Sequence, residues 1–215
     1  MAYDLEEQEQ IDQFKAFWAK YGNLISWVVI IALAGYAGWT YWSNMQGSHA
    51  SQAAGLYNTM ETALEAKDNA KAQTAAGDIR KEFGDTVYAQ FSALAAAKMA
   101  IDTNDTKAAK AQFQWVIDSK YNDEFVTIAR VRLSGILLDE KAYDDAMKLL
   151  AADAPAKFQA LVQDRKGDIL AAQNKIDEAR AMYKSALDKT DEKSPAHNMI
   201  EIKLESVGGS SAKSA

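Results

Sequence analysis

The clearest pattern in the chain is an apolar run, Leu24 to Trp42, that contains no charged side chain. At about 1.5 Å of rise per residue, a helix of this length is roughly 28 Å long, close to the thickness of the hydrocarbon core of a bilayer. A helix in the core of a soluble bundle is the alternative, but it would normally carry a polar stripe at helical spacing, and this run has none. The pattern therefore predicts a transmembrane helix over residues 24–42.

The residues before this run separate into two parts. Residues 1–10 are acidic and polar, and we expect them to be disordered. From residue 11 onward, aromatic and apolar side chains fall on one side of a helix, an arrangement that suits the headgroup layer of a membrane. Residues 1–23 are thus predicted to form an acidic head followed by an aromatic amphipathic helix. Its apolar positions are Ile11, Phe14, Phe17, Trp18 and Tyr21.

The basic residues on the two sides of the run predict its orientation. Lys15 and Lys20 flank the N-terminal side, whereas the next basic residue on the other side is Lys67. Because Lys and Arg are retained on the cytoplasmic side, the head is predicted to be cytoplasmic and the larger part of the chain to be translocated. A cleaved signal peptide, with a cleavage site at Ser48-His49-Ala50, is the alternative. The acidic head and the length of the apolar run argue against it.

Small residues gather on one face of the predicted span. Ala34 and Gly38 form a small-xxx-small pair, which lets a second helix approach closely in lipid. The alternative is that Gly and Ala are simply common in transmembrane helices. The predicted face for a partner inside the membrane consists of Ile31, Ala34, Gly35, Gly38 and Trp42.

Beyond the span, residues 43–207 carry apolar residues at spacings of three and four, in successive segments separated by turn-forming residues. The two Pro residues and the many Ala, Lys, Glu and Gln residues favour helices throughout. Phe91 and Ile101 are expected on the apolar face of the segment that follows Thr86, and Met199 and Ile202 on that of the last segment. The fold class is therefore predicted to be all-α, with a flexible tail, GGSSAKSA, over residues 208–215.

These helical segments repeat. When the second helices of successive pairs are aligned, alanines fall in one column at Ala72, Ala109, Ala146 and Ala179, and larger residues generally follow four positions later. The pattern is similar to the tetratricopeptide repeat, which has a period of about 34 residues. Helix pairs of this kind bury their apolar faces by stacking on one another. A plain antiparallel bundle remains the alternative. The predicted packing positions are Ala109, Phe113, Ala146, Leu150, Gly167, Ala179 and Tyr183.

Charge and chemistry narrow the function classes. The net charge is −6, and the chain lacks the basic footprint that nucleic-acid binding requires. Cysteine is absent, and His49 and His197 lie far apart without metal-ligand spacing. The acid pairs Asp144-Asp145 and Asp177-Glu178 fall in the first turns of predicted helices, where the helix dipole explains them. We predict no catalytic residue, cofactor, metal site or small-molecule substrate.

The order of these motifs resembles the YfgM family, the ancillary subunits of the SecYEG translocon in Gram-negative bacteria. The resemblance is carried by the head EEQEQIDQFKAFWAKYGN, by a span that ends in GWTYW, and by the last repeat unit, GDILAAQNKIDEARAMYKSAL. It covers nearly the whole chain. It implies a bacterial inner-membrane protein with its repeat domain, residues 43–207, in the periplasm. Its implied partners are the SecYEG translocon and a PpiD-type periplasmic chaperone.

Three function classes follow. The leading hypothesis is a non-enzymatic adaptor that binds a chaperone or an emerging secretory chain at the membrane. The second is a scaffold that associates with itself through Ala34 and Gly38 and uses the repeats as a spacer. The third, an enzyme built from scattered acidic residues, has no motif to support it.

Overall fold

The computed structural model describes residues 2–210, and the side chains of residues 10–210. This part of the chain is helical with no strand, so the predicted all-α class is confirmed. The chain divides into two compact units, Met1–Ser51 and Gln52–Ala215. The boundary lies within the first helix, α1 (Ala2–Glu65).

The N-terminal unit is a single helical segment. Helix α1 begins at Ala2, so the expectation that residues 1–10 are disordered is wrong for the residues described. Glu and Gln have high helix propensity, and acidic residues at a helix N-terminus interact favourably with the helix dipole. The helix also continues through Gly22, which is covered by the indole of Trp18.

Aromatic side chains lie near both ends of the predicted span. Phe14 stacks on Trp18 with 6.3 Å between ring centroids, and Trp39 contacts Trp42 at 6.1 Å. Between them the apolar side chains are exposed, as a lipid-facing helix requires. One helix within the described residues, Gln10–Glu65, is long and apolar enough to cross a membrane.

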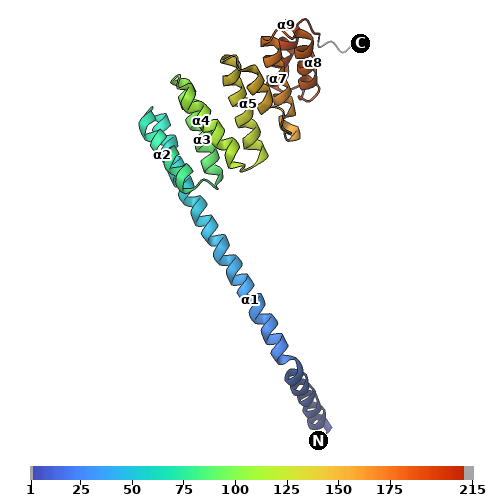
Figure 1. Cartoon of the computed structure of the whole chain (residues 1–215). Helices are drawn as coiled ribbons and strands as arrows, with labels where there is room; N and C mark the ends of the chain where they lie inside the picture. The colour runs from blue at the N-terminus through green and yellow to red at the C-terminus, as the bar shows by residue number, and fades with distance from the viewer. Residues whose placement is uncertain (1, 211–215) are drawn as a thin grey trace. The chain divides into compact units, whose positions relative to one another are not determined.

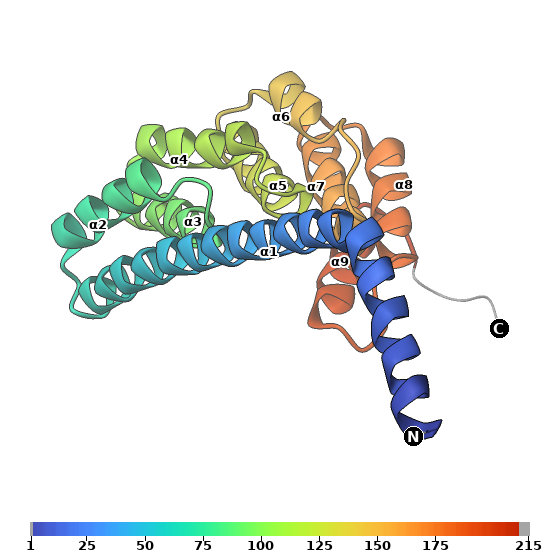
Figure 2. The same ribbon diagram turned by 90° about the horizontal axis from the view of Figure 1, so that it is seen from below.

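The second unit is a stack of helices (Figure 1). It begins with the C-terminal part of α1, residues 52–65, and ends with a single helix, α9, that follows the last helix pair and packs against it. Figure 2 shows α3, α5 and α7 in one row and α4, α6 and α8 in another. The elements are α2 (Asn69–Glu82), α3 (Val87–Asp102), α4 (Thr106–Ser119), α5 (Asp123–Asp139), α6 (Tyr143–Leu149), the 3-10 turn η1 (Ala156–Phe158), α7 (Gln159–Ala172), α8 (Ile176–Leu187) and α9 (Pro195–Ser206).

The helices of the second unit form four pairs: the C-terminal part of α1 with α2, α3 with α4, α5 with α6, and α7 with α8. The turn inside each pair has the same geometry. One residue adopts a left-handed conformation, with φ between 57° and 61°, at Lys67, Asn104, Lys141 and Asn174. The next N–H donates to a carbonyl five residues earlier, as Lys175 does to Leu170 at 2.9 Å. This is the hydrogen-bond pattern of a Schellman helix end. The intervals between the four turns match those between the predicted alanine columns, because each alanine follows its turn residue by five positions.

The predicted packing positions lie inside the stack. The four column alanines are fully buried, and Phe113, Leu150 and Tyr183 four positions later are 2–3% exposed. An alanine at the crossing lets the two helices approach closely, and the larger residue one turn later fills the space beside it. The repeat therefore reflects one packing solution used four times.

Gly167 permits a close approach between α7 and the ring of Tyr183 on α8. A Cβ atom placed on Gly167 would lie 2.5 Å from a ring carbon of Tyr183, so only glycine leaves room for this ring. The hydroxyl of Tyr183 donates to Asp168 at 3.0 Å, which holds the ring over Gly167. Gly167 and Tyr183, two of the predicted packing positions, are thus in direct contact.

Some apolar positions differ from expectation. Phe91 and Ile101 of α3 are 41% and 45% exposed, and Met199 and Ile202 of α9 are 62% and 63% exposed, although all four were placed on apolar faces. In α3 the buried positions are mainly alanines, and the larger side chains of Phe91 and Ile101 are covered only in part by the neighbouring helices. In the predicted tail, Gly208 has φ 73° and its N–H donates to Glu205, which closes α9. Residues 211–215 lie outside the described residues.

Candidate functional site

The predicted face for a membrane partner lies on the exposed surface of α1. Ile31 and Trp42 are 66% and 56% exposed. No atom lies within 4 Å of a Cβ placed on Gly35 or Gly38. This face is therefore open to a second helix, with the two glycines and Ala34 allowing close backbone approach.

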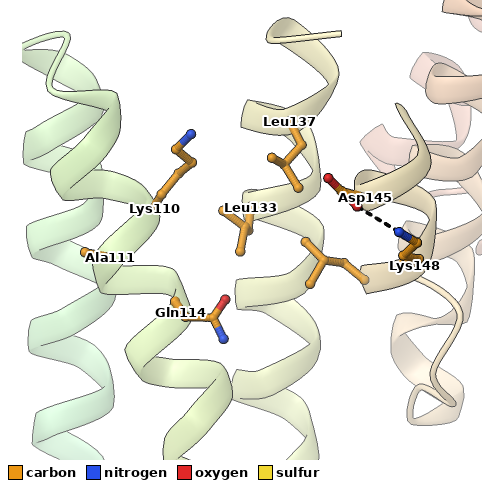
Figure 3. Close-up of a pocket in the computed structure, with 8 residues that line it drawn as sticks. Lys110, Ala111, Gln114, Leu133, Leu137, Asp145 and Lys148 are labelled. Carbon is orange, nitrogen blue, oxygen red and sulfur yellow. Dashed lines mark hydrogen bonds and ion pairs between the residues drawn. The ribbon is translucent and has the colours of Figure 1, made fainter. Parts of the chain in front are cut away.

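A groove of about 580 Å³ opens between α4, α5 and α6 (Figure 3). Leu133 and Leu137 of α5, together with Leu149 of α6, make its surface mainly apolar. On its rim, Lys110 binds Glu140 at 2.8 Å and Lys148 binds Asp145 at 3.0 Å. Apolar side chains fit such a groove, and its charged rim residues are already paired.

An ionic cluster joins α9 to α7. The ammonium of Lys203 lies 2.8 Å from Asp164 and 2.8 Å from Asp168. Burial raises the pKa of Asp164 above its ordinary value, and the hydrogen bond from Lys203 opposes that rise. Burial, with the charge of Asp168, also raises the pKa of the Tyr183 phenol. The cluster thus joins the last helix to α7 through charged groups that are partly shielded from solvent.

A row of five aromatic side chains runs across α1, α3 and the start of α5, and one of the five lies in the connection just before α5. We call it the aromatic ladder: Tyr57, Tyr88, Phe91, Tyr121 and Phe125. Tyr57 of α1 contacts Tyr88 and Phe91 of α3, with ring centroids 5.8 and 6.0 Å apart. Phe91 contacts Phe125 of α5 at 5.4 Å, and Phe125 contacts Tyr121 at 6.0 Å.

The aromatic ladder is accessible from outside the stack. Phe91 and Tyr121 are 41% and 39% exposed, and the other three rings are half-buried. Sequence reasoning did not identify this surface, although Tyr57, Phe91 and Phe125 follow one another at intervals of 34 residues. That interval was the available signal, but it was not separated from the signal of the apolar core.

Within the described residues, no group of three or more His, Asp or Glu lies so that it could hold a metal ion. The prominent surface features are an apolar helix of membrane length, an apolar groove and the aromatic ladder.

These features define a class, a helical-repeat protein of the tetratricopeptide type with an N-terminal helix that could cross a membrane. A family model described as "Tetratricopeptide repeat-like domain" matches residues 15–209. The chain is also similar, over most of its length, to curated proteins that share one name.

The ancillary SecYEG translocon subunit of Neisseria gonorrhoeae is 31% identical over 208 residues, which cover 96% of this chain and 100% of that protein. The proteins of that name from Haemophilus influenzae and Escherichia coli are 28% and 24% identical, covering 84% and 92% of this chain and 91% and 95% of their own lengths. The chain belongs to the family of ancillary SecYEG translocon subunits. The resemblance to the YfgM family is thereby confirmed.

Proposed function

We propose that this protein is a non-enzymatic interaction module at the SecYEG translocon of the bacterial inner membrane. In this proposal it links a PpiD-type periplasmic chaperone to secretory chains that emerge across the membrane. The observation that carries the proposal is similarity over 96% of the chain to a relative whose name makes it a subunit of that translocon. A membrane-length helix and stacked helix pairs support it, because solenoids of this kind present extended surfaces to other proteins.

The proposed topology places the N-terminus in the cytoplasm and the repeat domain in the periplasm. The bias of Lys15 and Lys20 supports this orientation. When protease is added to intact spheroplasts, we expect the repeat domain to be digested, leaving a short N-terminal fragment that contains the span. The undigested chain should have its full length. Protection of the repeat domain would reverse the orientation, and a chain shortened by about fifty residues would identify a cleaved signal peptide.

The proposed contact inside the membrane uses the face that contains Ala34, Gly35 and Gly38. Replacing Gly38 with isoleucine should reduce recovery of translocon components in mild detergent severalfold, because a bulky side chain prevents close helix approach. The matched control is Ala37→Ile, which adds similar bulk about a third of a turn away. If Gly38→Ile abolished self-association and left translocon recovery unchanged, the scaffold hypothesis would replace this contact.

A further inference from the structure

The aromatic ladder differs from the ordinary apolar surface of a soluble domain. Exposed apolar residues usually occur singly, whereas here five rings form an unbroken series of contacts across α1, α3 and α5. The ring of Phe91 is central, since it contacts Tyr57 on one side and Phe125 on the other. Stacking or burying such rings against a partner contributes more than their area alone, which makes aromatic residues common anchors at interfaces.

The charges beside the ladder favour a cationic partner. Burial is the main cause of the raised pKa of Tyr57, and the interaction of its hydroxyl with Glu61 raises this pKa further. Asp123, the first residue of α5, lies two residues before Phe125 and is exposed. Lys120 is the cation next to Tyr121 in the sequence.

A second cation near the ladder is already paired. Lys157 lies 2.6 Å from Glu124, the residue directly before Phe125. Residues 52–215 also carry a net charge of −3, because the chain total is −6 and residues 1–51 contribute five acids and two lysines. The electron-rich ring faces attract Lys and Arg side chains in addition. A basic partner therefore gains from both the rings and the surrounding acids.

We propose that the aromatic ladder is the binding surface for an extended polypeptide segment in which apolar and basic side chains alternate. The proposal rests on the proposed function, which brings non-native chains to the repeat domain. Successive side chains of an extended segment point to opposite sides, so the apolar set can face the exposed rings of Phe91 and Tyr121. The long, flexible basic side chains can then bend back toward the acidic groups of Glu61 and Asp123. A surface of anionic lipid is disfavoured by the same acidic groups.

The test uses the full chain in nanodiscs and a fluorescent, unstructured peptide of alternating leucine and lysine, compared with a twin that carries glutamate in place of lysine. By fluorescence anisotropy at low salt, the basic peptide should bind at least about tenfold more tightly than the acidic twin, and added salt should reduce this difference. Phe91→Ala should weaken binding of the basic peptide about tenfold. Equal affinity for the two peptides would overturn the proposal.

A matched control lies on the same helix. Ile101 of α3 is exposed to a similar extent as Phe91 but makes none of the ladder's ring contacts, so Ile101→Ala should change affinity less than about twofold. Equal losses in the two variants would refute a role for the ladder. If thermal unfolding shows that Phe91→Ala is misfolded, Tyr121→Ala, which alters the exposed ring before α5, takes its place. Affinity that followed the anionic lipid content of the nanodisc instead of these substitutions would also overturn the proposal.

The same variants separate this inference from the proposed function. Translocon recovery from membranes should be unchanged by Phe91→Ala, because the proposed contact with the translocon lies in the span. A wild-type chain that binds the peptide through Phe91 but recovers no translocon would support the ladder and refute the proposed function. A wild-type chain that recovers the translocon but does not bind the peptide would refute the ladder alone.

Discussion

Replacing Lys203 with methionine is expected to lower the free energy of unfolding by about 3 kcal/mol at pH 7. Methionine keeps much of the apolar stem and removes the charge. Asp164 and Asp168, whose side chains are 18% and 17% exposed, then lose the cation that each contacts at 2.8 Å. Removing one partner costs more than the pair contributes, since two poorly solvated carboxylates remain side by side. Arg165, 3.3 Å from Asp168, compensates their charge only in part.

The pH dependence of this loss has a definite sign. Burial already raises the pKa of Asp164 in the folded protein, and removal of Lys203 raises it further. A carboxyl group whose folded pKa exceeds its unfolded value contributes stability that is complete below the unfolded pKa, about 3.9, and is lost as pH rises through the folded pKa. The deficit of the variant should therefore shrink as pH falls from 7 towards 4. Urea unfolding of the full chain in detergent at several pH values measures it.

The matched control is Lys98→Met. Lys98 binds Asp102 at 2.7 Å, but both side chains are largely exposed, 77% and 58%. Exposed pairs of this kind contribute less than about 1 kcal/mol. A loss in Lys203→Met that was no larger than in this control, or that did not change with pH, would contradict the buried character of the cluster.

Replacing Gly167 with alanine should destabilise the protein by about 2 kcal/mol, even though alanine normally stabilises a helix by about 1 kcal/mol relative to glycine. The added Cβ would lie 2.5 Å from the ring of Tyr183. That ring is 3% exposed and is held by Asp168, so it cannot move aside without breaking a partly buried hydrogen bond. The cost of overpacking therefore exceeds the gain in helix propensity.

Gly77 also lies inside a helix, α2, but its replacement with alanine is expected to have the opposite effect on stability. A Cβ placed there meets no atom within 4 Å, so Gly77→Ala should stabilise the chain by about 0.5–1 kcal/mol. Thermal and urea unfolding of both variants separate packing from propensity. If both substitutions stabilised the chain, the close approach of α7 and α8 at Gly167 would be refuted.

Local patterns in the sequence were sufficient to predict the apolar helix of membrane length, the helices that follow it and the buried alanines that recur in each helix pair. A charge-free run of that length predicts a helix long enough to cross a membrane, and the structure has an apolar helix there. The alanine columns were visible because each repeat solves the same packing problem with a small residue at the helix crossing. Ala109 and Phe113, for example, are defined by spacing alone, and the structure places both in the interior.

The ladder and the ionic cluster could not be predicted in the same way. Phe91 follows the apolar spacing of α3 as well as a core residue would, yet 41% of it is exposed. Its partners Tyr57 and Phe125 lie 34 residues away on either side. Likewise, nothing in the sequence near Lys203 points to Asp164, which lies 39 residues earlier.

The sequence alone therefore determined the membrane-length helix, the all-helical fold and the repeat, because each depends on periodicity or length within a short segment. Only the tertiary structure decided which apolar residues stay at the surface and which charges meet. Those outcomes depend on how far each helix is covered by its neighbours, and the covering side chains come from segments distant in the chain.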